Sequence, residues 1–149
     1  MNYLQWLEEP DVFQVNREKA HSDHLFFQSY EEMEEYPKGR LRQSLNGKWQ
    51  FFYADCLQNR VADFYKQDFD MAAADTIEVP AHIQLQGYGR CQYVNVMYPW
   101  DGVEEIYPPE IPKIHNAVGS YVKYFDVGDE WLEKDVFLSF QGVETAFCV

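Results

Sequence analysis

The residues of this chain best suited to chemistry lie between Gly87 and Trp100. This stretch, GYGRCQYVNVMYPW, carries three tyrosines, a tryptophan and a single asparagine, Asn95. Aromatic rings stack on flat apolar faces such as the C–H side of a sugar, and an amide both donates and accepts hydrogen bonds, as a hydroxyl group does. Asn95, between Tyr93 and Tyr98, is therefore a candidate saccharide contact. The alternative interpretation is an asparagine that binds the backbone of its own loop.

Other reactive side chains form no recognisable catalytic or metal-binding pattern. The sequence contains no nucleophile-elbow, zinc-protease, phosphate-loop or dinucleotide motif. A pair among its 25 acidic residues could cleave a glycosidic bond, but most of them lie in charged, turn-like segments typical of a solvated surface. His21 and His24 flank Asp23 without a third convincing ligand, which favours capping or surface roles over a metal site.

Composition and charge narrow the class of protein. The chain has 149 residues, the size of one ordinary domain, and its 46% hydrophobic residues suffice for a packed core. With a formal net charge of −13, we expect neither nucleic acid nor an anionic membrane as a partner. The three cysteines form no CxxC pair, and no signal sequence or membrane span is recognisable, so we expect a cytoplasmic setting.

The elements expected to position Asn95 are antiparallel strands. In the strand expected after the Asn46-Gly47 turn signal, Trp49, Phe51 and Tyr53 should share one face. Arg60–Phe69 is compatible with one or two helical turns. The apolar alternation predicts further strands in residues 75–79, 119–127 and 135–143, and another from Thr145. Strands spaced by turns indicate an all-β sandwich or barrel.

The pattern divides the chain into two parts. Residues 1–45 have no sustained period and are expected to form an extended N-terminal arm, whereas residues 46–149 form the first part of a β-sandwich domain. Residues 81–118 have almost no period and should be a functional loop. The sequence stops at Val149 within an apolar alternation, from which we expect a fragment of a longer domain.

Several motifs carry a family resemblance. The segments SLNGKWQF, IEVPAHIQLQGYG, YVNVMYPW, NAVGSYVKYFDV and FLSFQGVETAFCV occur in this order. Together they resemble the N-terminal sugar-binding domain of the bacterial β-galactosidases, which belong to glycoside hydrolase family two. The resemblance extends from about Trp6 to Val149. It implies an antiparallel jelly-roll-like β-sandwich, incomplete here and the first of several domains.

The resemblance also implies roles for single residues. Asn95 would contact the galactosyl group of a terminal β-galactoside such as lactose, and Tyr93, Tyr98 and Pro99 would hold its loop in shape. The two catalytic glutamates and the ligands of an active-site Mg²⁺ would lie in a later barrel domain. No catalytic residue and no metal ligand is therefore expected in this chain, which alone should be inactive. The remaining domains of a homo-oligomeric parent enzyme would be its partners.

Three alternatives remain open. The first is another family-two specificity, such as a β-glucuronidase, against which the Tyr-x-Asn-Val-x-Tyr-Pro motif argues. The second is a stand-alone carbohydrate-binding module. The third is a complementing piece that docks on a partner chain carrying the barrel.

Overall fold

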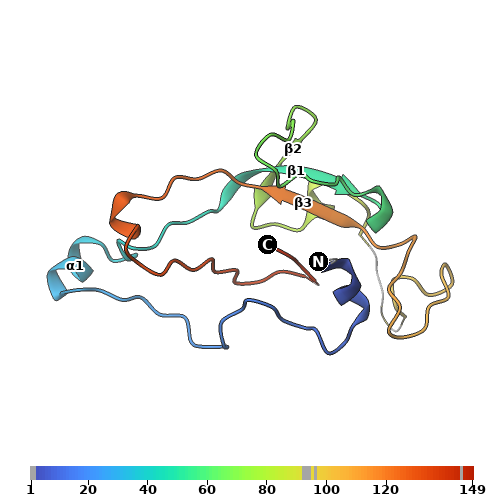
Figure 1. Ribbon diagram of the computed structural model, residues 1–149, viewed down its shortest axis with the longest axis horizontal. Coiled ribbons are helices and arrows are strands. Elements are labelled where there is room, and N and C mark those ends of the chain that lie inside the picture. The colour runs from blue at the N-terminus through green and yellow to red at the C-terminus, as the bar shows by residue number, and fades with distance from the viewer. Residues whose placement is uncertain (1–2, 92–94, 96, 145) are drawn as a thin grey trace. The chain divides into compact units, whose positions relative to one another are not determined.

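The described part of the chain confirms the predicted all-β class. The structure is a computed structural model that describes residues 3–91, 95, 97–144 and 146–149. The strands β1 (Gly47–Ala54), β2 (Asp75–Val79) and β3 (Val118–Val122) form one antiparallel sheet in the order β2–β1–β3 (Figure 1). Helix is scarce, as expected for an incomplete jelly-roll-like sandwich: the described residues hold α1 (Tyr30–Glu35) and four short 3-10 turns, at Tyr3–Glu8, Leu57–Asn59, Ile83–Gln86 and Asp129–Trp131.

The chain forms two compact units. The first combines Met1–Asp11 with Asn46–Tyr124 and contains the whole three-stranded sheet. The second combines Val12–Leu45 with Phe125–Val149 and contains α1. Each unit joins segments from both sides of residue 45, and the predicted domain division at that residue stays a prediction.

The two most deeply buried side chains of the first unit lie on one face of the sheet. Phe51 is 0% exposed and Ile77 is 1% exposed. Register places Phe51 opposite Tyr121, with ring centroids 4.8 Å apart, and Trp49 opposite Ile77. The predicted face of alternate residues on β1 is thus confirmed. Burying one such aromatic ring stabilises a fold by about 1.5–3 kcal/mol.

The connection between β1 and β2 packs on the opposite face through Phe69, whose ring meets Phe52 edge-on at 5.9 Å. The helical turns expected for Arg60–Phe69 are replaced by hydrogen-bonded turns, in which Lys66 N–H donates to the Asp63 carbonyl at 2.9 Å. The physical reason is the backbone of Asp63, whose φ of 60° is left-handed and interrupts a right-handed helix.

The second unit is mostly extended. In this unit no helix or strand occurs in residues 12–29, and α1 begins after Ser29. The Ser29 hydroxyl accepts a hydrogen bond from Glu32 N–H at 3.2 Å, and Glu31 and Glu32 lie in the positively polarised first turn. This capping stabilises a helix start by about 1 kcal/mol.

Two predicted strands are wrong for the described residues. No sheet pairing occurs in residues 135–143 or in the described residues after Thr145. In addition, β3 ends at Val122, whereas the predicted strand extends to Val127. A β-strand requires a neighbour for its N–H and C=O groups. The alternation there is real, but within the described residues this segment runs without a ladder, and large apolar side chains such as Phe137 and Leu138 are exposed.

Close packing at Gly119 gives a first prediction. A Cβ added there would lie 2.8 Å from Phe51 Cε2 and 2.9 Å from Tyr121 Cε2. Because Phe51 is fully buried, Gly119→Ala is expected to lower the free energy of unfolding by about 1–3 kcal/mol. Urea unfolding followed by tryptophan fluorescence would measure the change. Gly142→Ala, where a Cβ meets nothing within 4 Å, is the control, and equal effects of the two substitutions would contradict this packing.

Candidate functional site

The loop that carries Asn95 leaves the sheet at its β2 edge. The Gln86 side-chain amide accepts a hydrogen bond from Glu78 N–H at 2.8 Å and donates one to the Glu78 carbonyl at 3.0 Å. One side chain thus pairs with the backbone of β2 as a neighbouring peptide would. Gly87, with φ at 96°, then ends the 3-10 turn Ile83–Gln86.

The next two residues fasten the entry of the loop to β1. The Tyr88 ring lies 4.8 Å from the Phe51 ring and 5.8 Å from the Tyr53 ring, measured between centroids. Desolvation, together with a hydrogen bond to the Asp75 carboxylate, raises the pKa of Tyr88. Gly89 lies against the Tyr53 hydroxyl, 2.9 Å from where a Cβ would be. The entry of the loop therefore has little freedom to shift.

This contact gives a second prediction. Gly89→Ala would place a residue with a Cβ atom in a left-handed backbone conformation, with φ at 66°. The added Cβ would also clash with the Tyr53 hydroxyl. Gly102→Ala is a matched control, because its φ is 78° but nothing lies within 4 Å of the added Cβ. We expect both to destabilise by about 1–2 kcal/mol through the backbone, and Gly89→Ala by about 1 kcal/mol more through the clash. Equal losses in chemical denaturation would contradict the contact with Tyr53.

Asn95 itself lies exposed on a bend. Three residues later the Tyr98 ring, 66% exposed, stacks on Trp100 with centroids 5.0 Å apart and an interplanar angle of 5°. Asp101 N–H donates to the Tyr98 carbonyl at 3.0 Å, and Tyr98 N–H donates to Asp101 Oδ2 at 2.9 Å. Pro99 holds the second position of this turn, where its fixed φ is favourable.

The exit of the loop is fastened by a carboxylate. Glu104 accepts hydrogen bonds from the backbone N–H groups of Lys113, Ile114 and His115, at 2.5, 2.9 and 3.5 Å. These donors lower the pKa of Glu104 below its usual range, so the carboxylate is ionised at neutral pH. The interaction is lost only as the pH falls through that lowered pKa. β3 begins a few residues further on, so the exit also leads directly into the sheet.

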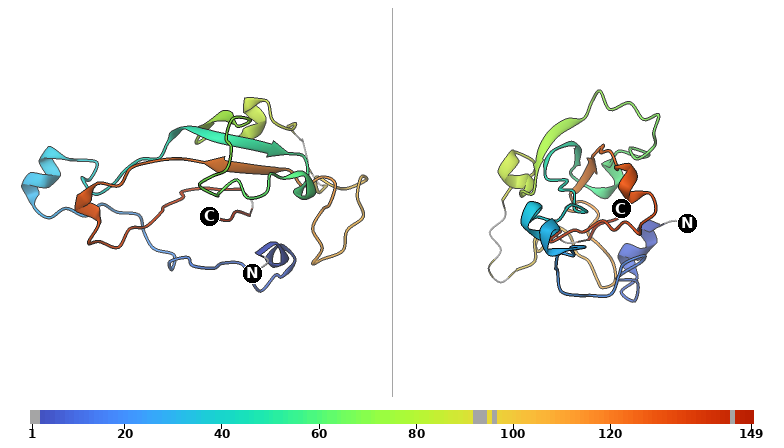
Figure 2. Two further views of the ribbon diagram at one scale, coloured as in Figure 1. Left: turned by 45° about the horizontal axis from the view of Figure 1, so that its top comes forward. Right: turned by 90° about the vertical axis from the view of Figure 1, so that its left-hand side faces the viewer.

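The described residues of this loop, 87–91, 95 and 97–117, are here called the arch, and its part after Tyr98 lies beyond the end of the sheet at which β3 begins (Figures 1 and 2). An open hollow of 440 Å³ is lined by Trp100, Asp101, Gly102, Val103, Glu104, Glu105 and Ile106. Asn95 does not line this hollow. The arch thus carries an exposed amide, that of Asn95, between an entry fastened at Tyr88 and an exit fastened at Glu104.

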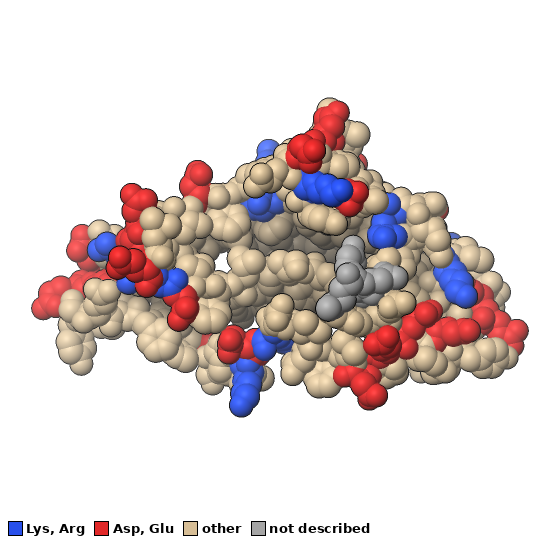
Figure 3. All heavy atoms as spheres, viewed as in Figure 1, with Lys and Arg blue, Asp and Glu red and all other residues tan. Residues whose placement is uncertain are grey.

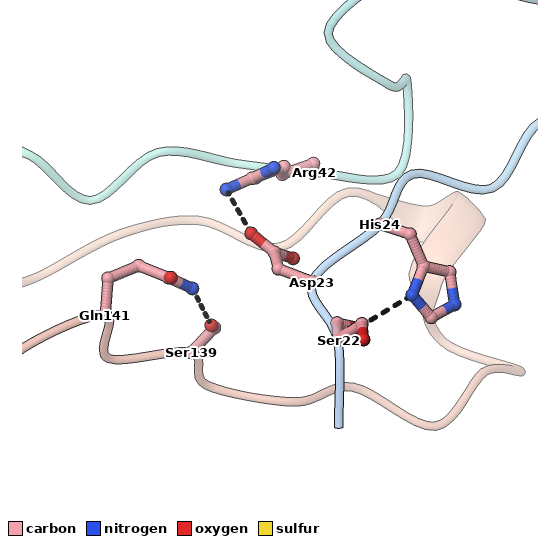
Figure 4. A network of polar contacts seen from close by, with 6 residues as sticks. All are labelled: Ser22, Asp23, His24, Arg42, Ser139 and Gln141. Carbon is pink, nitrogen blue, oxygen red and sulfur yellow. Dashed lines mark hydrogen bonds and ion pairs between the residues drawn. The ribbon is translucent and has the colours of Figure 1, made fainter. Parts of the chain in front are cut away.

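The two histidines of the second unit, His21 and His24, each form a hydrogen bond with a backbone carbonyl two residues before them. His24 Nδ1–H donates to the Ser22 carbonyl at 2.7 Å, and Asp23 forms an ion pair with Arg42 at 3.7 Å (Figure 4). His21 likewise donates to the Lys19 carbonyl, at 2.8 Å. In the part of the chain that the structure describes, no three His, Cys, Asp or Glu side chains are placed to hold a metal ion.

The basic side chains are scattered. On the face drawn in Figure 3, Lys and Arg side chains are interspersed among more numerous Asp and Glu side chains and gather into no continuous basic area outside the atoms drawn in grey. Among the described residues, no helix has both the length and the apolar character needed to cross a membrane.

The predicted site residues are therefore only partly brought together. Tyr98 and Pro99 lie in the turn that follows Asn95, while Tyr93 lies outside the described residues. Sequence reasoning missed Gln86 and Glu104, which fasten the two limbs by contacts with residues 8–11 positions away. No short motif encodes such pairs. Asp101 was missed as well, although the Tyr-Pro-Trp-Asp order is a local turn signal that could have indicated it.

The antiparallel sheet and the loop that leaves it define a domain of the all-β class. The family model described as "Glycosyl hydrolases family 2, sugar binding domain" matches residues 42–149. The chain belongs to this family.

Curated relatives agree with this membership. A "Beta-galactosidase" of Clostridium acetobutylicum is 53% identical over 98% of this chain and 16% of its own length. One of Streptococcus thermophilus is 49% identical over 97% of this chain and 14% of its own length. A "Beta-galactosidase large subunit" of Leuconostoc lactis is 43% identical over 98% of this chain and 25% of its own length. The chain thus spans between about one seventh and one quarter of the length of these relatives.

Proposed function

We propose that this chain is the N-terminal sugar-binding part of a β-galactosidase that hydrolyses terminal non-reducing β-D-galactosides such as lactose. The observation that carries the proposal is the 53% identity to the Clostridium acetobutylicum β-galactosidase across 98% of this chain. The reaction retains the configuration at the anomeric carbon and uses two carboxylates, one as acid/base and one as nucleophile. Both belong to parts of the protein outside this chain.

Asn95 is the proposed substrate contact within this chain. Its side-chain amide binds a hydroxyl group of the galactosyl unit, which can both donate and accept a hydrogen bond. Two features support this role: Asn95 is exposed on a bend, and the limbs on either side of it are fastened by Tyr88 and Glu104. A loop held in its binding conformation loses less conformational entropy when the sugar binds. Tyr93, Tyr98 and Pro99 support its shape.

Catalysis is assigned to the remaining domains. The six asparagines of the sequence are followed by Tyr, Arg, Gly, Arg, Val and Ala, so the Asn-Glu pair of the family's acid/base residue does not occur here. The Mg²⁺ expected for the whole enzyme is likewise assigned to those domains. The chain alone binds at most part of the sugar and does not hydrolyse it.

The proposed partners follow from the relatives' names and lengths. Leuconostoc lactis and Lactobacillus helveticus have relatives named "Beta-galactosidase large subunit", which supports further domains or a second subunit as partners. We extend the proposal to a cytoplasmic homo-oligomer.

The test is the intact mass and substrate range of the native gene product. A mass far above 17.7 kDa, with hydrolysis of nitrophenyl β-galactoside, would support the proposal. Turnover of nitrophenyl β-glucuronide instead would assign the chain to a β-glucuronidase relative. A 17.7 kDa product that binds galactosides without cleaving them would indicate a stand-alone module. If activity arises only after a second chain is added, the chain is a complementing piece.

A further inference from the structure

One side chain ties together two parts of the arch that are far apart in sequence. Glu104 collects three successive backbone N–H groups, those of Lys113, Ile114 and His115, on its two carboxylate oxygens. A carboxylate that receives several backbone donors forms strong, charge-assisted hydrogen bonds. The low pKa of Glu104 has this cause, with the Ile114 and Lys113 amides contributing most. This exit segment continues within a few residues into β3.

The same residue is joined to the turn that follows Asn95. Glu104 N–H donates to the Trp100 carbonyl at 3.0 Å, and the Trp100 ring stacks on Tyr98 at 5.0 Å. Contacts therefore link residues 113–115, through Glu104 and Trp100, to Tyr98, which lies three residues beyond Asn95 in the chain.

We propose that Glu104 is a positioning residue for galactoside binding, which holds Asn95 in place by tying the turn after it to the segment before β3. The proposal rests on the proposed function of Asn95. Glu104 touches no substrate in this account and acts through Asn95. Glu105, its neighbour, supplies a matched control, because its carboxylate accepts a hydrogen bond from the Tyr107 hydroxyl and from no amide of the exit segment.

The first measurement concerns the contact alone and needs no substrate. In the full-length enzyme, hydrogen exchange of the amides of residues 113–115 is compared between the unchanged protein, Glu104→Gln and Glu105→Gln. Both substitutions remove one negative charge and keep the side-chain size. We expect exchange to become about tenfold faster in Glu104→Gln, because an amide oxygen cannot replace both carboxylate acceptors, and to stay unchanged in Glu105→Gln.

The second measurement connects the contact to the sugar. We expect Glu104→Gln to lower kcat/KM for nitrophenyl β-galactoside about three- to tenfold, because the substitution displaces Asn95. The loss should not exceed that of Asn95→Ala, since Glu104 acts only through Asn95. In an Asn95→Ala background the same substitution should have no further effect, since there is no longer an amide to position. Glu105→Gln should leave kcat/KM unchanged in both backgrounds.

The outcomes separate this proposal from the one on which it rests. Unchanged exchange in Glu104→Gln would overturn the contact. Two outcomes would overturn the positioning role and leave the Asn95 contact intact. One is faster exchange in Glu104→Gln with unchanged kcat/KM. The other is a loss of kcat/KM from Glu104→Gln that is the same in the Asn95 and Asn95→Ala backgrounds. If Asn95→Ala itself leaves kcat/KM unchanged, the proposed sugar contact falls, and the role of Glu104 in placing it falls too.

Discussion

Replacement of Phe51 by alanine is expected to lower the free energy of unfolding of this chain by about 3–5 kcal/mol. Phe51 is 0% exposed at the centre of β1, where its ring touches both Tyr88 and Tyr121. Its removal opens a cavity between the sheet and the entry limb of the arch, and neighbouring rings can fill that cavity only in part. Urea unfolding, followed through tryptophan fluorescence, would measure the loss.

The control for this experiment is Phe26→Ala. Phe26 is 80% exposed, so the same chemical change should shift the free energy of unfolding by less than about 0.5 kcal/mol. A similar shift for both variants would mean that Phe51 is not the centre of the core. Loss of Phe51 should also release Tyr88, and with it the entry of the loop, which links the stability of the sheet to the site.

In the proposed full-length β-galactosidase, replacement of Asn95 by alanine is expected to lower kcat/KM for a β-galactoside about tenfold, which corresponds to about 1.4 kcal/mol. The physical reason is the loss of a hydrogen bond from the Asn95 amide to a sugar hydroxyl. That hydroxyl is then left without a partner. Because Asn95 is exposed on a bend, the free energy of unfolding should change by less than about 0.5 kcal/mol. Steady-state kinetics and thermal unfolding would measure the two effects.

Asn59→Ala is the matched control. Asn59 is also exposed, and its amide donates to Asp55 Oδ1 at 2.8 Å in a different loop. Its replacement should leave kcat/KM unchanged. An equal loss of activity in both variants would point to a general effect of removing a surface amide, and would remove Asn95 from the proposed site.

The central sheet was predictable because its signals are local. The Asn46-Gly47 turn signal and the alternation in β1 predict both the strand and the face that Phe51 occupies, and Pro80 marks the end of β2. The position of Asn95 outside any helix or strand followed in the same way, from an aromatic stretch without a period. These features depend on neighbouring residues, so a single sequence contains them.

The errors arise where a partner decides the structure. The alternation after Val136 is typical of a strand, but within the described residues that segment has no ladder.

The helix α1 was missed although Ser29 and Glu32 form an N-terminal capping pattern. The expectation for residues 1–45 was an extended arm without a helix. A backbone φ of 60° at Asp63, which no residue pattern announced, removed the expected helical turns nearby.

The supports of the site were hidden for a related reason. The side chain of Gln86 binds backbone groups of Glu78, and that of Glu104 binds backbone N–H groups of residues 113–115. Backbone groups occur along the whole chain, so the sequence does not indicate which of them a polar side chain will bind. Only the folded geometry selects these pairs. The sequence therefore predicts Asn95 as the candidate ligand contact, and the structure adds the contacts that fasten its loop.

The most direct test of the central claim compares the full-length enzyme with its Asn95→Ala variant on nitrophenyl β-galactosides that each lack one ring hydroxyl. If Asn95 binds one hydroxyl, the activity ratio between the two proteins should be about tenfold for substrates that keep this hydroxyl. It should fall to near one for the single substrate that lacks it. A ratio that is the same for every substrate would contradict the claim that Asn95 contacts the galactosyl group.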